Sequence, residues 1–228
     1  LVKKVQRNYQ LFHDFGHTVV AQCEEGLVYP SAEFYTKLRV SREALDEVDL
    51  FFAWGKNQAS DILKKMPGKE GKIILAGNPR IDLLDKRFRG VFEKDVEEIK
   101  SQHSPYLLVN TNFSSFTHTI GSEAVIQRLK AKGTIKTAEE EAFYRGRADN
   151  RKVLFDKFVV MLESLDSSLT GYNIILRPHP SEDVSLWQDA VSHLQSVKVI
   201  REGSAIPWII GSELMIHNDC TTAIEATI

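Results

Sequence analysis

The sequence predicts an α/β fold made of two lobes, each built on a parallel sheet. Short apolar runs alternate with amphipathic stretches along the 228 residues, which is typical of strands layered with helices. These runs fall into two sets, one before residue 83 and one after Pro105. A charged, helix-forming stretch without a strand pattern separates the two sets, at residues 83–104.

The first lobe is predicted to hold three strands with helices between them. The apolar runs that indicate the strands are residues 18–22, 50–54 and 72–76. Residues 41–48 and 57–65 have helical spacing, and Ser41 is a suitable N-cap for the first of these helices.

The second lobe is predicted to hold four strands and three long helical stretches. The strands are residues 106–110, 173–177, 197–200 and 214–217. The helical stretches are residues 123–132, 138–165 and 185–194. The polar segment 113–146 is longer than a compact crossover needs, so we expect an insertion or a mobile cover there.

The expected organisation is an N-terminal lobe, a linker and a C-terminal lobe: residues 1–90, 91–104 and 105–228. The chain starts at Leu1 rather than Met and stops at Ile228 within a predicted helix, so we expect both lobes to be truncated. In sheets of this kind ligands bind beyond the carboxyl ends of the strands, which predicts a cleft between two facing lobes.

Composition narrows the class of protein. A net charge of −2 gives no basic field for nucleic acid. Cys23 and Cys220 lie far apart without metal-ligand spacing, which favours a reducing, cytoplasmic compartment and no bound metal. No apolar run is long enough for a signal peptide or a membrane span. Glycine-rich dinucleotide and Walker-type loops are absent, which disfavours nicotinamide chemistry and ordinary nucleotide hydrolysis.

Two polar clusters follow strands of the first lobe. Glu24 and Glu25 precede Gly26 directly after the first strand, and one carboxylate could act as a general base in the cleft. A solvated acidic turn is the alternative. After the third strand, Asn78 and Arg80 lie in a Gly-Asn-Pro turn, which favours a rigid bend whose polar side chains could also face the cleft.

The strand ending at Arg177 carries the most informative cluster. Pro178 and Pro180 flank His179 and fix its backbone, which favours a functional imidazole. Arg177 offers a planar fork suited to phosphate or carboxylate.

The last strand is followed by small hydroxyl residues at the start of a helix. Thr221 and Thr222 could hold a phosphate there, with Glu225 one turn later accepting from ribose hydroxyls. An ordinary N-capped helix is the alternative. Asn112 and Ser114, after residues 106–110, would border the same cleft and could also bind the donor.

Three motifs resemble the bacterial surface-carbohydrate biosynthesis proteins, which are glycosyltransferases of the GT-B type: residues 77–84, 177–182 and 220–226. A wider likeness links Glu24-Glu25-Gly26, His179-Pro180 and Thr221-Thr222 to bacterial transferases that use CMP-sialic acid or CMP-Kdo. That likeness implies that Glu25 is the catalytic carboxylate and that His179 contacts the donor phosphate. It also implies that Thr221 and Thr222, which stand where those transferases have serines, hold this phosphate. The last lobe also resembles non-hydrolysing UDP-N-acetylglucosamine epimerases, in which a Glu at the position of Glu225 grips ribose.

These resemblances imply a metal-independent glycosyltransferase that needs no cofactor. It would move a sugar from a nucleotide-activated donor, such as CMP-Kdo, onto a surface polysaccharide or lipid-linked glycan. Such an acceptor leaves room for peripheral contact with the inner membrane face. A UDP-sugar transferase or epimerase, and a non-catalytic scaffold on the same lobes, are the alternatives. The sequence does not choose between inversion and retention of configuration.

Overall fold

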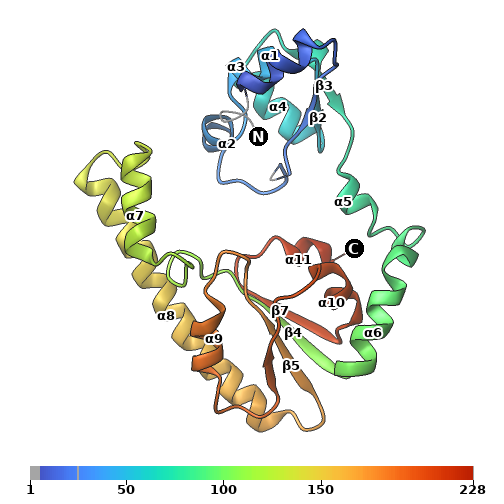
Figure 1. The fold of residues 1–228 in the computed structure, drawn as a ribbon, viewed down its shortest axis with the longest axis vertical. Helices are drawn as coiled ribbons and strands as arrows, with labels where there is room; N and C mark the ends of the chain where they lie inside the picture. The colour runs from blue at the N-terminus through green and yellow to red at the C-terminus, as the bar shows by residue number, and fades with distance from the viewer. Residues whose placement is uncertain (1–5, 25, 228) are drawn as a thin grey trace. The chain divides into compact units, whose positions relative to one another are not determined.

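The computed structural model describes residues 6–24 and 26–227 (Figure 1). The chain divides into two compact units, with the boundary between Phe88 and Arg89. Each unit is an α/β layer structure with its own parallel sheet, as the sequence predicts.

The first unit holds a three-stranded parallel sheet in the order β1-β2-β3. Its strands are β1 (Val20–Gln22), β2 (Leu50–Ala53) and β3 (Ile73–Leu75). All three strands are confirmed, and each is shorter than predicted. At β1 the reason is local, because the Val19 N–H donates to the Asp49 carboxylate at 2.7 Å. That side chain takes the place of a ladder partner.

Short helical elements alternate with these strands along the chain. They are α1 (Gln6–Asp14), α2 (Ala32–Leu38), α3 (Arg42–Glu47), α4 (Lys56–Lys65), η1 (Glu70–Lys72) and α5 (Pro79–Asp82). Helix α4 packs against β2 and β3. Ser41 caps α3 as predicted, since its hydroxyl accepts from the Ala44 N–H at 3.3 Å. The core includes Tyr35, Phe51 and Ile62, all at most 1 % exposed.

The second unit holds four parallel strands in the order β6-β5-β4-β7. They are β4 (Tyr106–Asn110), β5 (Asn173–Arg177), β6 (Val197–Val199) and β7 (Leu214–His217). The chain winds outward from β4 through β5 to β6 and then returns to the other side of β4. The strand order therefore reverses between β4 and β7, and ligands bind doubly wound sheets at that switch point.

Helices cover both faces of the second sheet. The helical elements are η2 (Arg89–Phe92), α6 (Glu93–His103), α7 (Ser122–Ala131), α8 (Ala138–Ser168), α9 (Val184–Ala190), α10 (Ala205–Gly211) and α11 (Thr222–Glu225). One face packs Trp187 and Phe155 of α9 and α8, and the other packs Trp208 of α10. Both tryptophans are buried. Helix α6, placed in the linker by the sequence, packs against α10 within the second unit (Figure 1).

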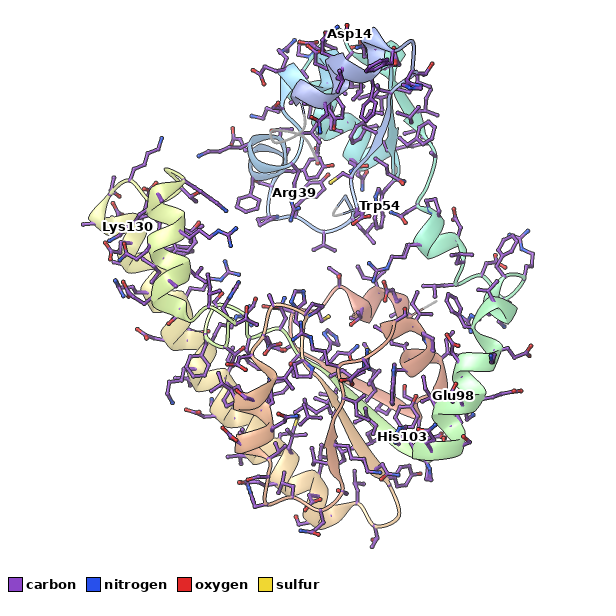
Figure 2. The ribbon with its side chains drawn as sticks, in the orientation of Figure 1. Asp14, Arg39, Trp54, Glu98, His103 and Lys130 are labelled. Atoms are coloured by element: carbon purple, nitrogen blue, oxygen red, sulfur yellow. The ribbon has the colours of Figure 1, made fainter. Side chains whose placement is uncertain are left out.

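The long polar segment 113–146 contains α7 and the first turns of α8, which run side by side as a helical hairpin (Figure 1). Thr137 and Glu140 form a capping box that starts α8. Arg145 of α8 binds Glu123 of α7 at 2.7 Å and Glu141 at 2.9 Å. Lys130, labelled in Figure 2, adds a 2.7 Å ion pair with Glu141. Charge pairing therefore links the two helices.

We expect this hairpin to loosen in acid. The guanidinium of Arg145 lowers the pKa of Glu123 from 4.5 to about 2. A carboxylate whose pKa is lower in the folded than in the unfolded state stabilises the fold fully at a pH above the unfolded pKa. The stabilisation of the hairpin by Glu123 is therefore complete above pH 4.5 and is lost as the pH falls toward 2. Amide hydrogen exchange of residues 122–145, corrected for intrinsic rates, measures the loss. Glu123→Gln should show a smaller pH dependence than the parent chain, and an equal dependence would contradict the assignment.

Candidate nucleotide site in the second unit

The loops that follow β4 and β7 are joined at the switch point. The Asn112 N–H donates to Asn218 Oδ1 at 2.8 Å, and Asn110 Nδ2 donates to Thr222 Oγ1 at 3.0 Å. Ser114 Oγ in turn donates to Asn112 Oδ1 at 2.9 Å. The Asn218 N–H also donates to the Asn110 carbonyl at 3.4 Å. Asn112, Ser114 and Thr222, which the sequence assigns to donor binding, therefore lie in one hydrogen-bonded group.

His179 lies on the neighbouring loop, after β5, with its ring orientation fixed. The Ser181 N–H donates to His179 Nδ1 at 3.1 Å, and the Ser181 hydroxyl lies 2.7 Å from the same nitrogen. Because Nδ1 accepts a backbone N–H, the neutral ring carries its proton on Nε2. Pro178 is buried, whereas His179 is half-buried and Pro180 is exposed. The loop thus presents an N–H donor on a ring with a defined tautomer.

Glu182 organises this loop, and sequence reasoning missed its role. It is fully buried and accepts four hydrogen bonds. The His179 N–H and the Thr111 hydroxyl donate to Oε1, both at 2.9 Å. The Thr117 hydroxyl and Trp187 Nε1 donate to Oε2, at 2.9 and 3.0 Å. The spacing His-x-x-Glu was the available signal, since it is short enough for a carboxylate to reach the His backbone.

Backbone bonds also join the β4 loop to the His179 loop. The Thr119 N–H donates to the Ser181 carbonyl at 3.1 Å, and the Asp183 N–H donates to the Thr117 carbonyl at 2.6 Å. The β4 loop is therefore tied to its neighbour on each side. Three polar strand ends, after β4, β5 and β7, make one continuous surface.

Arg177 does not take the role expected of it. Its guanidinium donates to four backbone carbonyls in residues 200–203, the closest at 2.8 Å, and lies 5.0 Å over the ring of Trp208. Burial lowers the pKa of Arg177 to about 10, so it remains charged near neutral pH. The fork predicted for phosphate instead holds the segment between β6 and α10, and we leave it out of the phosphate site.

The residues around α11 that the sequence assigns to phosphate and ribose binding differ in their surroundings. Thr221 is exposed at the N-cap position, but its side chain makes no capping bond. Thr222 Oγ1 donates to Cys220 Sγ at 3.0 Å besides accepting from Asn110. Thr221 thus occupies the N-cap position that the alternative gave it, without the side-chain hydrogen bond of a cap. Glu225 is 7 % exposed, and Asp219 has a φ of 45° with its carboxylate paired to Arg151.

Of the acidic cluster in the first unit, Glu25 lies outside the described residues. Glu24 is exposed and Gly26 is buried. A Cβ at Gly26 would lie 2.0 Å from Gln58 Nε2 and 2.9 Å from the Trp54 ring, so close packing requires glycine there (Trp54 is labelled in Figure 2). Gln58 holds that place by donating to the Tyr35 hydroxyl at 2.6 Å.

The turn after β3 is the rigid bend that the sequence favours. Asn78 is buried and its Oδ1 accepts from the Arg80 N–H at 2.9 Å, with Pro79 as the first residue of α5. The Asn78 side chain thus caps a helix, while Arg80 is exposed.

Within residues 6–24 and 26–227, no group of three or more His, Cys, Asp or Glu side chains could hold a metal ion. The same residues include no helix that is long and apolar enough to cross a bilayer.

The fold has known counterparts among solved structures. No protein-family model and no curated protein matches the sequence. The chain superposes on the UDP-GlcNAc 2-epimerase of Methanocaldococcus jannaschii with a TM-score of 0.56 and 14 % identity, covering 97 % of this chain and 55 % of that one. The fold is GT-B-like. Two Rossmann-like lobes are thereby confirmed as the fold class.

A second GT-B-like structure is more distantly similar. The UDP-GlcNAc 2-epimerase from Neisseria meningitidis, bound to UDP-GlcNAc, gives a TM-score of 0.49 and 12 % identity over 96 % of this chain and 59 % of that one. The chain thus spans little more than half the length of each of these two structures.

Proposed function

We propose that the second unit binds a nucleotide-activated sugar and that the protein breaks the bond between the sugar's anomeric carbon and the phosphate. The observation that carries this proposal is the joining of three polar strand ends at the switch point of a doubly wound sheet. Doubly wound sheets bind nucleotides at this place because backbone N–H groups and short polar side chains converge there.

The chemistry of the site fits a departing phosphate. Negative charge gathers on that phosphate as the bond to the sugar breaks, and preorganised donors lower the energy of such a transition state. His179 offers an Nε2–H on a ring held by Ser181. Thr221 offers an exposed hydroxyl, and buried Glu225 would accept from ribose.

We propose a UDP-sugar as the substrate and epimerisation at C2 as the reaction. A base takes the C2 proton as UDP leaves the anomeric carbon with the electron pair of the broken bond, and UDP then adds back as a proton returns to the opposite face of C2. The support is the likeness of fold to the Methanocaldococcus UDP-GlcNAc 2-epimerase. Transfer from a CMP-sugar to a surface glycan is the second candidate. It keeps the support of the motif order in the sequence, but its expected base, Glu25, lies outside the described residues.

Thermal denaturation of the chain with UDP, UDP-GlcNAc or CMP tests the proposal. A ligand at 100 times its Kd stabilises by about 2.7 kcal/mol. For a chain of this size, that corresponds to a rise in Tm of roughly 5–10 °C. We expect UDP and UDP-GlcNAc to raise Tm more than CMP does.

A matched pair of variants locates the effect. Thr222→Val removes the hydroxyl bonded to Asn110 and should reduce the shift, whereas Thr134→Val, exposed in the α7–α8 turn, should leave it unchanged. A larger shift with CMP would favour the transferase. No shift with any nucleotide would leave the scaffold alternative standing and overturn the proposal.

A further inference from the structure

A cavity with polar groups in its lining lies beside the candidate nucleotide site. It has a volume of about 200 Å³ and opens between the loop after β4 and the α7–α8 hairpin. Its polar lining consists of Ser114, Ser115, His118, Ser122, Tyr144 and Arg147. Tyr144 and Arg147 are three residues apart on α8, so helical spacing places both on one face.

The lining is rich in donors, and none of its described residues carries a carboxylate. The Ile120 N–H donates to His118 Nδ1 at 3.2 Å, so the neutral ring of His118 also carries its proton on Nε2. Arg147 supplies a charged fork that matches carboxylate or phosphate oxygens. The hairpin carboxylates Glu123 and Glu141 bind Arg145 and do not line the cavity.

The opposite wall is apolar, and the volume is small. Val125, Ile126 and Leu129 of α7 repeat at helical spacing and form that wall. Pockets for drug-sized ligands span roughly 300–1,000 Å³, so this cavity suits a single sugar ring rather than a nucleotide. An apolar wall facing hydroxyl donors also fits a sugar, which has C–H faces and hydroxyl edges.

The cavity borders the nucleotide site. Ser114 lines the cavity and donates to Asn112 of the nucleotide site at 2.9 Å. His118 forms a β-bridge with Glu182, directly after the His179 loop. The lining of the cavity therefore contacts both the loop after β4 and the residue that holds the His179 loop in place.

We propose that this cavity binds an anionic, hydroxyl-rich group the size of one monosaccharide, with Arg147 holding its negative charge. The idea that the bound group is a second substrate rests on the proposed function. The prediction that the cavity binds such a group rests on the cavity alone. The anion has two possible sources: the carboxylate of an acidic glycan residue, or the phosphate of a sugar phosphate.

Calorimetric titration of the chain with glucuronate, glucose 6-phosphate and glucose tests the inference. We expect the preferred anionic sugar to bind at least about tenfold more tightly than neutral glucose, because charge-assisted hydrogen bonds are the stronger ones. A preference for glucuronate indicates an acidic glycan, and a preference for glucose 6-phosphate indicates a sugar phosphate. Equal affinity for glucose and both anions overturns the proposal.

Two variants that each remove one positive charge from α8 locate the site. Arg147→Gln should weaken anion binding about tenfold, and Lys157→Gln, exposed further along the helix, should leave it unchanged. Equal affinity in Arg147→Gln and the parent contradicts the assignment.

Arg147→Gln should still show the UDP-induced rise in Tm. Loss of anion binding with nucleotide binding kept supports the cavity as a separate site. If UDP binds the parent and neither anion does, the cavity inference alone fails. If an anion binds through Arg147 and no nucleotide binds, the proposed function fails and the cavity stands.

Discussion

Glu182→Leu is expected to destabilise the second unit by about 3–5 kcal/mol or to prevent its folding, since it leaves buried donors without an acceptor. Four donors meet this carboxylate, and two of them are N–H groups that cannot turn away: the His179 backbone and the Trp187 indole. They lie on opposite oxygens of Glu182. Guanidinium chloride unfolding followed by tryptophan fluorescence measures the loss.

Glu182→Gln keeps the experiment informative if the Leu variant does not fold. In either orientation of the amide, its NH2 group faces one of the two fixed N–H donors, so we expect a loss of about 2–3 kcal/mol. Glu139→Gln, exposed in the first turn of α8, is the control and should change stability by less than about 0.5 kcal/mol. A Glu182→Gln chain as stable as the parent would show that the carboxylate is not needed.

Under the proposed function, His179→Ala is expected to lower turnover of a UDP-sugar by about 10²–10⁴-fold, because it would remove a hydrogen-bond donor to the leaving phosphate. The fold should survive, since the alanine backbone still donates to Glu182. Product formation from UDP-GlcNAc, followed by anomer-resolved NMR, gives kcat and KM. The denaturation midpoint of the same sample shows whether the unit remains folded.

Two further variants separate the ring from its surroundings. Ser181→Ala keeps the backbone bond to Nδ1 and loses only the hydroxyl contact, so we expect a loss of about tenfold, mostly in kcat. His193→Ala changes an exposed histidine paired with Glu163 and should leave turnover unchanged. If His179→Ala turns over at the parental rate, the role assigned to the imidazole is wrong.

Three strands of the second unit, β4, β5 and β7, match the predicted residues. For β4 and β5 the signal is a buried apolar run flanked by a proline, Pro105 before β4 and Pro178 after β5, whereas β7 is an apolar run that is partly exposed. Helices α1 and α2 were not predicted. For α2 the signal was Ser31, whose hydroxyl accepts from the Phe34 N–H at 3.1 Å.

The polar residues were harder to predict, since their partners come from distant parts of the chain. The sequence places Arg177 at the end of its strand, but only the fold brings the carbonyls of residues 200–203 to its guanidinium. Glu182 accepts hydrogen bonds from the hydroxyls of Thr111 and Thr117, which lie in the loop after β4. Spacing along the chain predicts which side chains reach an edge of the sheet. It does not predict which of those side chains are already hydrogen-bonded to other parts of the protein.

The winding of the second sheet has a consequence for how the chain acquires its structure. Leu107 of β4 pairs with Ile174 on one side and Leu214 on the other. Strand β4 is thus the first strand of this sheet to be synthesised, and both strands that pair with it follow much later in the chain. Pairing residues so far apart in sequence closes long loops, which slows folding. During synthesis β4 is an exposed apolar segment, and chaperone binding to nascent chains should be strongest before β5 emerges from the ribosome.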